Sequence, residues 1–415
     1  MIRAGLQEIF RRKPGRYESI DGIRALAVIW VIFFHTLFEW GNFVSSEAYE
    51  AIVHSPWNWL WTKGYLAINP FFIISGFLIG DLLLSEYEKR GGIDLRAFYT
   101  RRIFRLAPAY YLVLAGFVAY WFYDPTLYSL RTIWANVLYV NNWLPHRNQP
   151  AIWTWSLAVE EQFYILCPLF ILLLRKKGLP AGKVILALMF LSIAWNYRTA
   201  VMKGPFKVLY HPVDDLDGYF RFFDYTYAKT TTRVSALLMG VGCAFLKRDG
   251  RWMDRLSSPV GTFALTFAFL AISFVSFNPA YLPPGGSVSP PLVTALFNPL
   301  SAFSFACLVM LLQTKRGFGA AADRFLGADV WYPVAQVSYG LYLLHCPVVD
   351  AFYKLFPPGP EIGFARLTLN ACAILLATFV AANGLNLFVE TPMRKLGYRL
   401  ARRKAENGLR ESHVA

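Results

Sequence analysis

Charged residues are scarce in this sequence. They make up 16% of its 415 residues, whereas 56% are hydrophobic, and so few charges do not cover the surface of a soluble domain of this length. Long apolar runs recur from one end to the other, which excludes a soluble protein held by a single anchor. The net charge of +15 does not indicate nucleic-acid binding, because the basic residues cluster in short segments between apolar runs.

Cysteine is also rare. The five cysteines all lie inside apolar runs and none has the spacing of metal ligands, so we expect small packing residues, no disulfide and no bound metal. They are Cys167, Cys243, Cys307, Cys346 and Cys372. A cleavage pattern of small residues is missing after Phe38, so the first apolar run is predicted to be retained as a span.

What the sequence has in abundance is apolar runs long enough to cross a bilayer. They predict an all-α polytopic membrane protein with about ten transmembrane helices. The predicted spans are residues 23–41, 64–84, 104–123, 152–174, 183–199, 232–247, 259–277, 295–313, 333–353 and 366–388. The amphipathic segment 128–142 is predicted not to cross.

The basic residues predict how these spans are oriented. Most Lys and Arg lie in six segments that this topology puts on one side of the membrane, which is the cytoplasmic side by the positive-inside rule. These segments are 1–24, 85–105, 175–183, 247–255, 315–324 and 391–415. Both termini are therefore predicted to be cytoplasmic. The chain divides into a membrane-embedded domain, 1–390, and a basic cytoplasmic tail, 391–415, expected to lie on anionic lipid.

A histidine inside the first span is the leading candidate for chemistry, because an ionisable group in a bilayer is costly. His35 follows Arg24 by eleven residues, about three helical turns, so both side chains share a face roughly 16 Å apart. A long ligand could place its charged end at Arg24 and its reactive end at His35. A neutral imidazole can take a proton from a hydroxyl group. Arg24 on its own would be better explained as a topology anchor.

Arginines and carboxylates mark two further helix ends. Arg102 and Arg105 are three residues apart on one face of the third span. If the first and third spans adjoin, they form a phosphate-binding cluster with Arg24; the alternative is again topology anchoring. Glu160 and Glu161 begin the fourth span and point about 100° apart. Either could orient an acceptor or support a histidine, and an interfacial cap is the alternative.

The ninth span carries a second intramembrane histidine. Ser338, Tyr342 and His345 are spaced to share one helix face. A transporter could also use His35 and His345, as a proton pathway. The cluster is therefore compatible with catalysis or with proton movement.

Two other spans contain unusual small or charged residues. Ser75, followed by Gly76 and Gly80, predicts close packing of the second span against a neighbour. Arg233 begins the sixth span at the end opposite to the basic segments, against the positive-inside bias, and therefore needs a partner or a ligand. Candidate partners on the preceding loop are Asp214, Asp215 and Asp217.

Taken in order, these motifs resemble the acyltransferase-3 family of membrane O-acyltransferases. The resemblance covers nearly the whole chain, and its motifs are specific as a set. It is carried by Arg24 with His35, Arg102-x-x-Arg105, Trp-Ser-Leu-x-Val-Glu-Glu-Gln-Phe-Tyr (Trp155 to Tyr164) and Ser-Tyr-Gly-x-Tyr-Leu-x-His (Ser338 to His345). The stretch Ser75 to Leu78, Arg233 and Glu390-x-Pro-x-Arg394 also fit. We expect Glu390 to end the last span.

The resemblance implies transfer of an acyl group, usually acetyl, from cytoplasmic acyl-CoA to a hydroxyl group. It implies that His35 is catalytic and that Arg24, Arg102 and Arg105 bind the donor. The domain 1–390 would then be the acyltransferase domain. The other candidate catalytic residues are Glu160, Glu161 and His345. The candidate acceptor-binding or supporting residues are Ser75, Trp155, Ser156, Arg233, Ser338 and Tyr342.

The acceptor predicted by the resemblance is a bacterial surface polysaccharide or a lipid-linked sugar, with the protein in the cytoplasmic (inner) membrane. Its partners would be acyl-CoA, with acetyl-CoA as the expected donor, the glycan and membrane lipids, with no nucleic acid and no metal. Many relatives carry an extracytoplasmic hydrolase-like domain, and this sequence predicts none. Alternatives are a secondary-metabolite acceptor such as an antibiotic, a proton-coupled transporter or flippase, and a non-catalytic export subunit.

Overall fold

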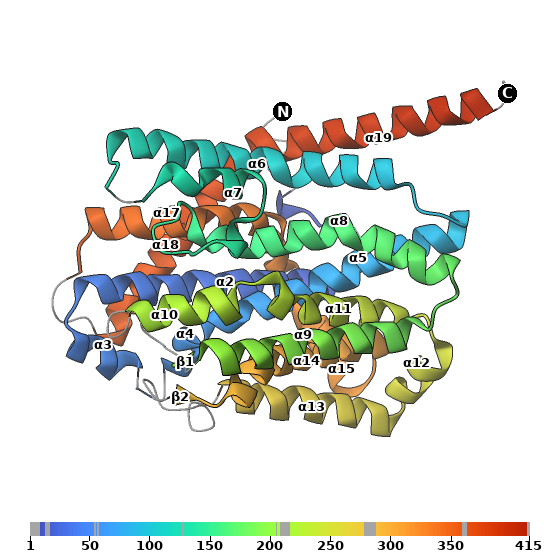
Figure 1. Cartoon of the computed structure of the whole chain (residues 1–415), viewed down its shortest axis with the longest axis horizontal. Helices are drawn as coiled ribbons and strands as arrows, with labels where there is room; N and C mark the ends of the chain where they lie inside the picture. The colour runs from blue at the N-terminus through green and yellow to red at the C-terminus, as the bar shows by residue number, and fades with distance from the viewer. Residues whose placement is uncertain are drawn as a thin grey trace.

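Long helices lying side by side make up most of the chain (Figure 1). In a bilayer each segment must satisfy its own backbone N–H and C=O groups, and a helix does so within the segment. The computed structural model describes residues 9–12, 17–53, 55, 58–126, 128–204, 206–207, 216–277, 288–358 and 363–412. Two strands of two residues each, β1 Phe206–Lys207 and β2 Val288–Ser289, pair antiparallel.

Each of the ten predicted spans coincides with a long helix. They are α2 Glu18–Trp40, α5 Ile68–Arg90, α6 Leu95–Tyr123, α8 Trp155–Lys176, α9 Ala181–Lys203, α11 Thr230–Leu246, α13 Pro259–Phe277, α14 Pro291–Thr314, α17 Ser338–Leu355 and α18 Phe364–Leu385. Within the described residues, eight helical stretches are long and apolar enough to cross a membrane. The other two helices, α11 and α17, have 17 and 18 residues and are not among these eight, so their crossing stays a prediction. The prediction of an all-α polytopic membrane protein is confirmed.

Short helices connect these spans. They are η1 Gly41–Phe43, α3 Ser46–Val53, α4 Trp59–Thr62, η3 Gly64–Ala67, η4 Leu130–Thr132, α7 Ile133–Val137, η5 Asn141–Trp143, η6 Ile152–Thr154, α10 Leu216–Phe222, η7 Phe223–Tyr227, α12 Gly250–Ser257, α15 Gly317–Leu326, η9 Asp329–Trp331 and α16 Tyr332–Gln336. The helix α7 has five residues and rises about 7.5 Å, far less than the roughly 30 Å of a bilayer core. The prediction that 128–142 does not cross is confirmed.

The last span continues past the position where the sequence predicted its end. α18 runs through the π-helical turn η10 Asn386–Glu390 into α19 Thr391–Ser412. Pro392 lies directly after this π-helical turn, and the helical run continues past it. α19 packs along α6 (Figure 1). The expected helix stop at Glu390 is therefore wrong, while the cytoplasmic placement of the tail stays a prediction.

The centre of the bundle is the pair α5 and α11. A Cβ added to Gly76 of α5 would lie 2.0 Å from the carbonyl oxygen of Leu237, and Gly240 of α11 approaches α5 equally closely. Such contacts let two backbones touch, which drives helix association in a membrane, where lipid tails are as apolar as leucine. The packing role predicted for Gly76 is confirmed. α13 and α6 lie at opposite edges of Figure 1 and bury the smallest fractions of their apolar windows.

Candidate active site

Two histidines from neighbouring spans face one another. His35 of α2 and His345 of α17 have ring centroids 4.7 Å apart. The Nδ1 atom of His35 lies 2.9 Å from the carbonyl oxygen of Val31, and that of His345 lies 2.6 Å from the carbonyl of Tyr342. A carbonyl can only accept a hydrogen bond, so each Nδ1 carries the hydrogen and each neutral ring keeps its lone pair on Nε2. The arrangement leaves two basic nitrogens side by side.

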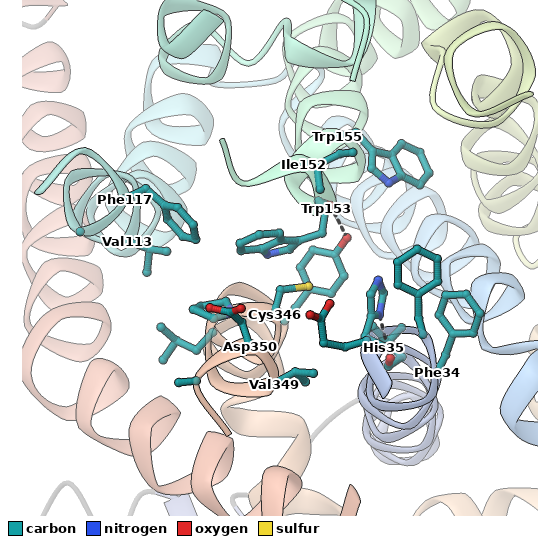
Figure 2. Close-up of a pocket in the computed structure, with 18 of the residues that line it drawn as sticks. Phe34, His35, Val113, Phe117, Ile152, Trp153, Trp155, Cys346, Val349 and Asp350 are labelled. Carbon is teal, nitrogen blue, oxygen red and sulfur yellow. Dashed lines mark hydrogen bonds between the residues drawn. The ribbon is translucent and has the colours of Figure 1, made fainter. Parts of the chain in front are cut away.

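His35 lines a cavity of about 1350 Å³. Figure 2 shows it between Phe34 and His35 of α2 on one side and Val113 and Phe117 of α6 on the other. Most of its walls are aromatic or aliphatic. The aromatic segment of α10 and η7 supplies Tyr219, Phe220, Phe222, Phe223 and Tyr227. His345 is fully buried and is not among the cavity-lining residues, so His35 is the histidine that a ligand would meet.

Tyr342 lines the cavity next to the histidines, and the buried Ser156 contacts it. The hydroxyl of Tyr342 lies 2.6 Å from Oγ of Ser156 and donates to the carbonyl of Trp153 at 2.7 Å. All three groups are buried. Because the carbonyl of the same Tyr342 accepts from His345, this tyrosine connects α8 and η6 to the histidine pair.

A line of polar side chains on α8 continues away from this wall. Ser156, Glu160 and Tyr164 recur every four residues and so lie on one helix face. Glu160 accepts hydrogen bonds from Ser75 at 3.1 Å and from Tyr164 at 2.7 Å. The guanidinium of Arg102 lies 4.7 Å from the centroid of the Tyr164 ring. The line therefore joins the histidine end of the cavity to the arginines.

The two adjacent glutamates do not reach the histidines. Among the described residues, Glu160 hydrogen-bonds only Ser75 and Tyr164, and Glu161 interacts electrostatically with Arg102. No hydrogen bond joins either carboxylate to an imidazole in the part of the chain that the structure describes. Their predicted catalytic roles stay predictions.

Arg24 and Arg105 meet in a second, small pocket. Arg24 donates to Oγ of Ser338 at 2.8 Å. The pocket is lined by Arg24, Arg105, Leu106, Gln336, Tyr339, Glu390 and Arg394. Arg102 turns towards α8 instead. The structure brings Arg24 and Arg105 together, as the sequence predicted, and places Ser338 with them rather than with the acceptor candidates.

The eleven-residue spacing in α2 has a counterpart in α17. Arg24 and His35 both face α17, where Ser338 and His345 are seven residues apart. The side chain of Arg24 is long enough to make up for the shorter spacing in α17. Arg24 and His35 therefore share a face, as predicted.

Arg233 lies buried behind the cavity wall. Its guanidinium is 4.0 Å from the ring of Tyr227 and 5.3 Å from that of Trp155, and Nη1 donates to Oδ1 of Asn69 at 3.1 Å. Both rings line the cavity, so Arg233 supports its wall. Asp217 pairs with Arg147, so its expected pairing with Arg233 is wrong. Asp214 and Asp215 lie outside the described residues.

Sequence analysis missed several residues of the site. Glu39 lines the cavity and follows His35 by four residues, so helical spacing already placed it on the same face. Cys346 lies beside His345, with Sγ 3.3 Å from its Nε2. The ligand atoms of His35, His345 and Cys346 lie within 4.8 Å of one another, a spacing at which they could hold a metal ion. The predicted absence of a metal stays a prediction.

Comparisons with known proteins agree on a single family. The profile of an acyltransferase domain, that of the acyltransferase-3 family, matches residues 17–383. Peptidoglycan O-acetyltransferase OatA of Listeria monocytogenes is 30% identical over 407 residues, which cover 92% of this chain and 56% of the relative. No solved structure matches the chain significantly.

Two further relatives are also named as O-acetyltransferases and match over a similar share of the chain. The putative peptidoglycan O-acetyltransferase YrhL of Bacillus subtilis is 29% identical, with 92% of this chain and 55% of the relative covered. O-acetyltransferase OatA of Staphylococcus aureus is 27% identical, with 93% and 58% covered. The chain thus spans a little over half the length of these relatives.

Proposed function

Because this chain belongs to the acyltransferase-3 family and is an acyltransferase of the multi-pass membrane type, we propose that it moves an acetyl group from acetyl-CoA to a hydroxyl group of a glycan. The observation that carries the proposal is the pair of carbonyl-anchored histidines, with His35 at the wall of the large cavity. We place the protein in the bacterial cytoplasmic membrane.

The transfer needs one base. Nε2 of His35 takes the proton of the acceptor hydroxyl while its oxygen attacks the thioester carbonyl. The tetrahedral intermediate then expels the CoA thiolate, which receives the proton from the imidazolium. The Val31 carbonyl holds Nδ1–H throughout, so the ring keeps its orientation. An acyl-histidine intermediate would use the same nitrogen as nucleophile.

The donor's phosphates belong at the arginine end. Guanidinium groups bind phosphate in a forked geometry, and Arg24 and Arg105 share the small pocket there. The described residues that line the large cavity include Glu39 and Asp350 but one basic residue, Lys354. That balance disfavours phosphate in the cavity. The pantetheine arm would therefore extend from the arginines towards His35, along the polar face of α8.

The acceptor belongs in the large cavity. Its volume of about 1350 Å³ exceeds that of most small-molecule pockets. Its aromatic walls suit sugar rings, whose C–H faces stack on aromatic side chains. The relatives are named for O-acetylation of peptidoglycan, which supports a polymeric glycan as the acceptor.

The first test uses purified protein, acetyl-CoA and a short oligosaccharide, without an ion gradient. We expect His35→Ala to lower kcat by about 10²–10⁴-fold, the usual effect of removing a general base. His146→Gln, at a buried histidine outside the cavity, is the matched control and should keep wild-type activity at pH 8. Full transfer by a folded His35→Ala protein would refute the mechanism. No transfer by the wild type would favour transport.

The donor site has a separate test. Arg24→Ala and Arg105→Ala should raise the KM for acetyl-CoA, because each removes a phosphate-binding fork. The KM for S-acetylpantetheine, which lacks the nucleotide phosphates, should stay unchanged. Equal effects on both donors would place the phosphates elsewhere.

A further inference from the structure

Three side chains of the types that bind metals meet where α2 and α17 pack together. His35 belongs to α2, and His345 and Cys346 belong to α17. Their ligand atoms lie within 4.8 Å of one another. His35 and Cys346 line the large cavity (Figure 2), and His345 is fully buried next to both. An ion that enters the cavity therefore comes within reach of all three.

The hydrogen bonds of this cluster leave lone pairs for a cation. Nδ1 of His35 donates to the carbonyl of Val31, and Nδ1 of His345 donates to that of Tyr342, so both Nε2 atoms carry a lone pair. Sγ of Cys346 lies 3.3 Å from Nε2 of His345, which accepts the thiol hydrogen. Histidines that bind metals almost always donate their other ring N–H to a carbonyl, a carboxylate or water. Both histidines already have this arrangement.

The spacing and the ligand types fit zinc. Zn–S bonds of about 2.3 Å and Zn–N bonds of about 2.05 Å put the sulfur and nitrogen ligands of a tetrahedral ion about 3.6 Å apart. The observed distance from Sγ of Cys346 to Nε2 of His345 is 3.3 Å, so a small shift is enough. Two imidazoles and one thiolate are a ligand set of zinc proteins, whereas Mg²⁺ and Ca²⁺ prefer oxygen ligands. The fourth position would be filled by water from the cavity.

Carboxylates near the cluster offset the charge of such an ion. Zn²⁺ bound to one thiolate and two neutral imidazoles keeps one positive charge, which is costly inside a membrane protein. Glu39 follows His35 by four residues and Asp350 follows Cys346 by four, so each shares a helix face with that ligand. Both carboxylates line the cavity and act electrostatically on Cys346. Because Asp350 pairs with Lys354, Glu39 is the carboxylate that balances the ion.

We propose that His35, His345 and Cys346 form a zinc site whose occupancy inhibits the transfer reaction. On binding, the thiol of Cys346 releases its proton to solvent, and the thiolate and the two Nε2 lone pairs bind Zn²⁺ without a change of oxidation state. Nε2 of His35 is then occupied and no longer takes the proton of an acceptor hydroxyl. The inhibition rests on the proposed function, whereas the metal site does not.

The ion is an inhibitor and not a cofactor, so the transfer reaction itself still needs no metal. The sequence did not indicate this site, because the spacing of cysteines along the chain says nothing about residues that α2 and α17 bring together. The predicted effect is reversible, since removing the ion frees the base.

Cobalt tests the site directly, because Co²⁺ replaces Zn²⁺ in such sites and a cobalt–thiolate bond absorbs in the near ultraviolet. The purified full chain, with its thiols reduced, is titrated with Co²⁺ and then with Zn²⁺. We expect the thiolate band in the wild type, its loss when zinc is added, and its absence from Cys346→Ser. Cys243→Ser, at a buried cysteine, and Cys372→Ser, at an exposed one, should keep the band. His345→Gln should raise the Kd for zinc by about ten-fold or more, and the control His146→Gln should not.

Acetyl transfer is then measured with and without zinc, each variant against itself, so that a changed basal rate does not affect the comparison. Saturating Zn²⁺ should lower the wild-type rate by about 10²-fold or more, as loss of the general base does, and EDTA should restore it. Cys346→Ser should need about ten-fold more zinc or more for the same inhibition, and Cys243→Ser should not. Mg²⁺ should have no effect.

The outcomes separate the site from the inhibition. No thiolate band in the wild type, or a band that persists in Cys346→Ser, would overturn the site. Zinc bound at the site without slower transfer would overturn the inhibition. If the wild type transfers no acetyl group even without zinc, the proposed function fails, and the cobalt spectra still decide whether the site exists.

Discussion

Gly76→Ala is the substitution whose cost follows most directly from the structure. The added Cβ would lie 2.0 Å from the carbonyl oxygen and 2.9 Å from the carbonyl carbon of Leu237. Real Cβ atoms essentially never approach closer than 3.0 Å, so α5 and α11 must part by about 1 Å or more. Neither contact is with a flexible side chain, and a close-packed interior resists such a shift.

The expected change in the free energy of unfolding of Gly76→Ala is the balance of two effects. Overpacking of this kind costs typically about 1–3 kcal/mol and occasionally more. Replacing glycine by alanine inside a helix returns up to about 1 kcal/mol. Because the obstacle is backbone, we expect the upper part of the range and a net loss of about 2 kcal/mol. Activity should fall as well, since the adjacent Ser75 donates to Glu160 and moves with α5.

Two other glycines supply graded controls. At Gly80, one turn further along α5, a Cβ would lie 3.1 Å from the Cβ of Ala244, a tight contact that a small shift relieves. At Gly116 it would meet nothing within 4 Å. When thermal unfolding is measured in one detergent, the Tm should therefore be highest for Gly116→Ala, lower for Gly80→Ala and lowest for Gly76→Ala. Equal Tm values for the three would refute the packing argument.

Two further predictions concern hydrogen bonds. Tyr342→Phe leaves the hydroxyl of Ser156 and the carbonyl of Trp153 without their bonds to the tyrosine, so it should cost about 1–3 kcal/mol and lower kcat; an unchanged unfolding curve would contradict the arrangement. His146 hydrogen-bonds Asp224, and both residues lie outside the spans. Burial lowers the pKa of His146 below its ordinary value of 6.5, and the Asp224 carboxylate offsets part of this shift. The folded protein thus favours the neutral ring, and the stability this contributes is complete above pH 6.5 and is lost as the pH falls below it. Tm measured from pH 8 to pH 5 should fall more steeply in the wild type than in His146→Gln, and parallel curves would contradict the prediction.

The sequence alone determined the features that depend on local spacing. Apolar runs of sufficient length specify spans, because a helix must satisfy its own backbone in lipid. The period of 3.6 residues places Arg24 and His35 on one face of α2, and it places Ser338, Tyr342 and His345 on one face of α17. The small residues of α5 marked a close helix contact, and Gly76 makes it. These properties involve residues of one segment, so no partner needs to be known.

Only the tertiary structure decided which faces meet. His35 and His345 are 310 positions apart in the chain and nearly touch, whereas Glu160 turns to Ser75 and away from both histidines. Arg233 packs on Tyr227 rather than pairing with Asp217. Every span of a bundle is apolar, so hydrophobicity does not identify its neighbours, and steric fit between helix surfaces does.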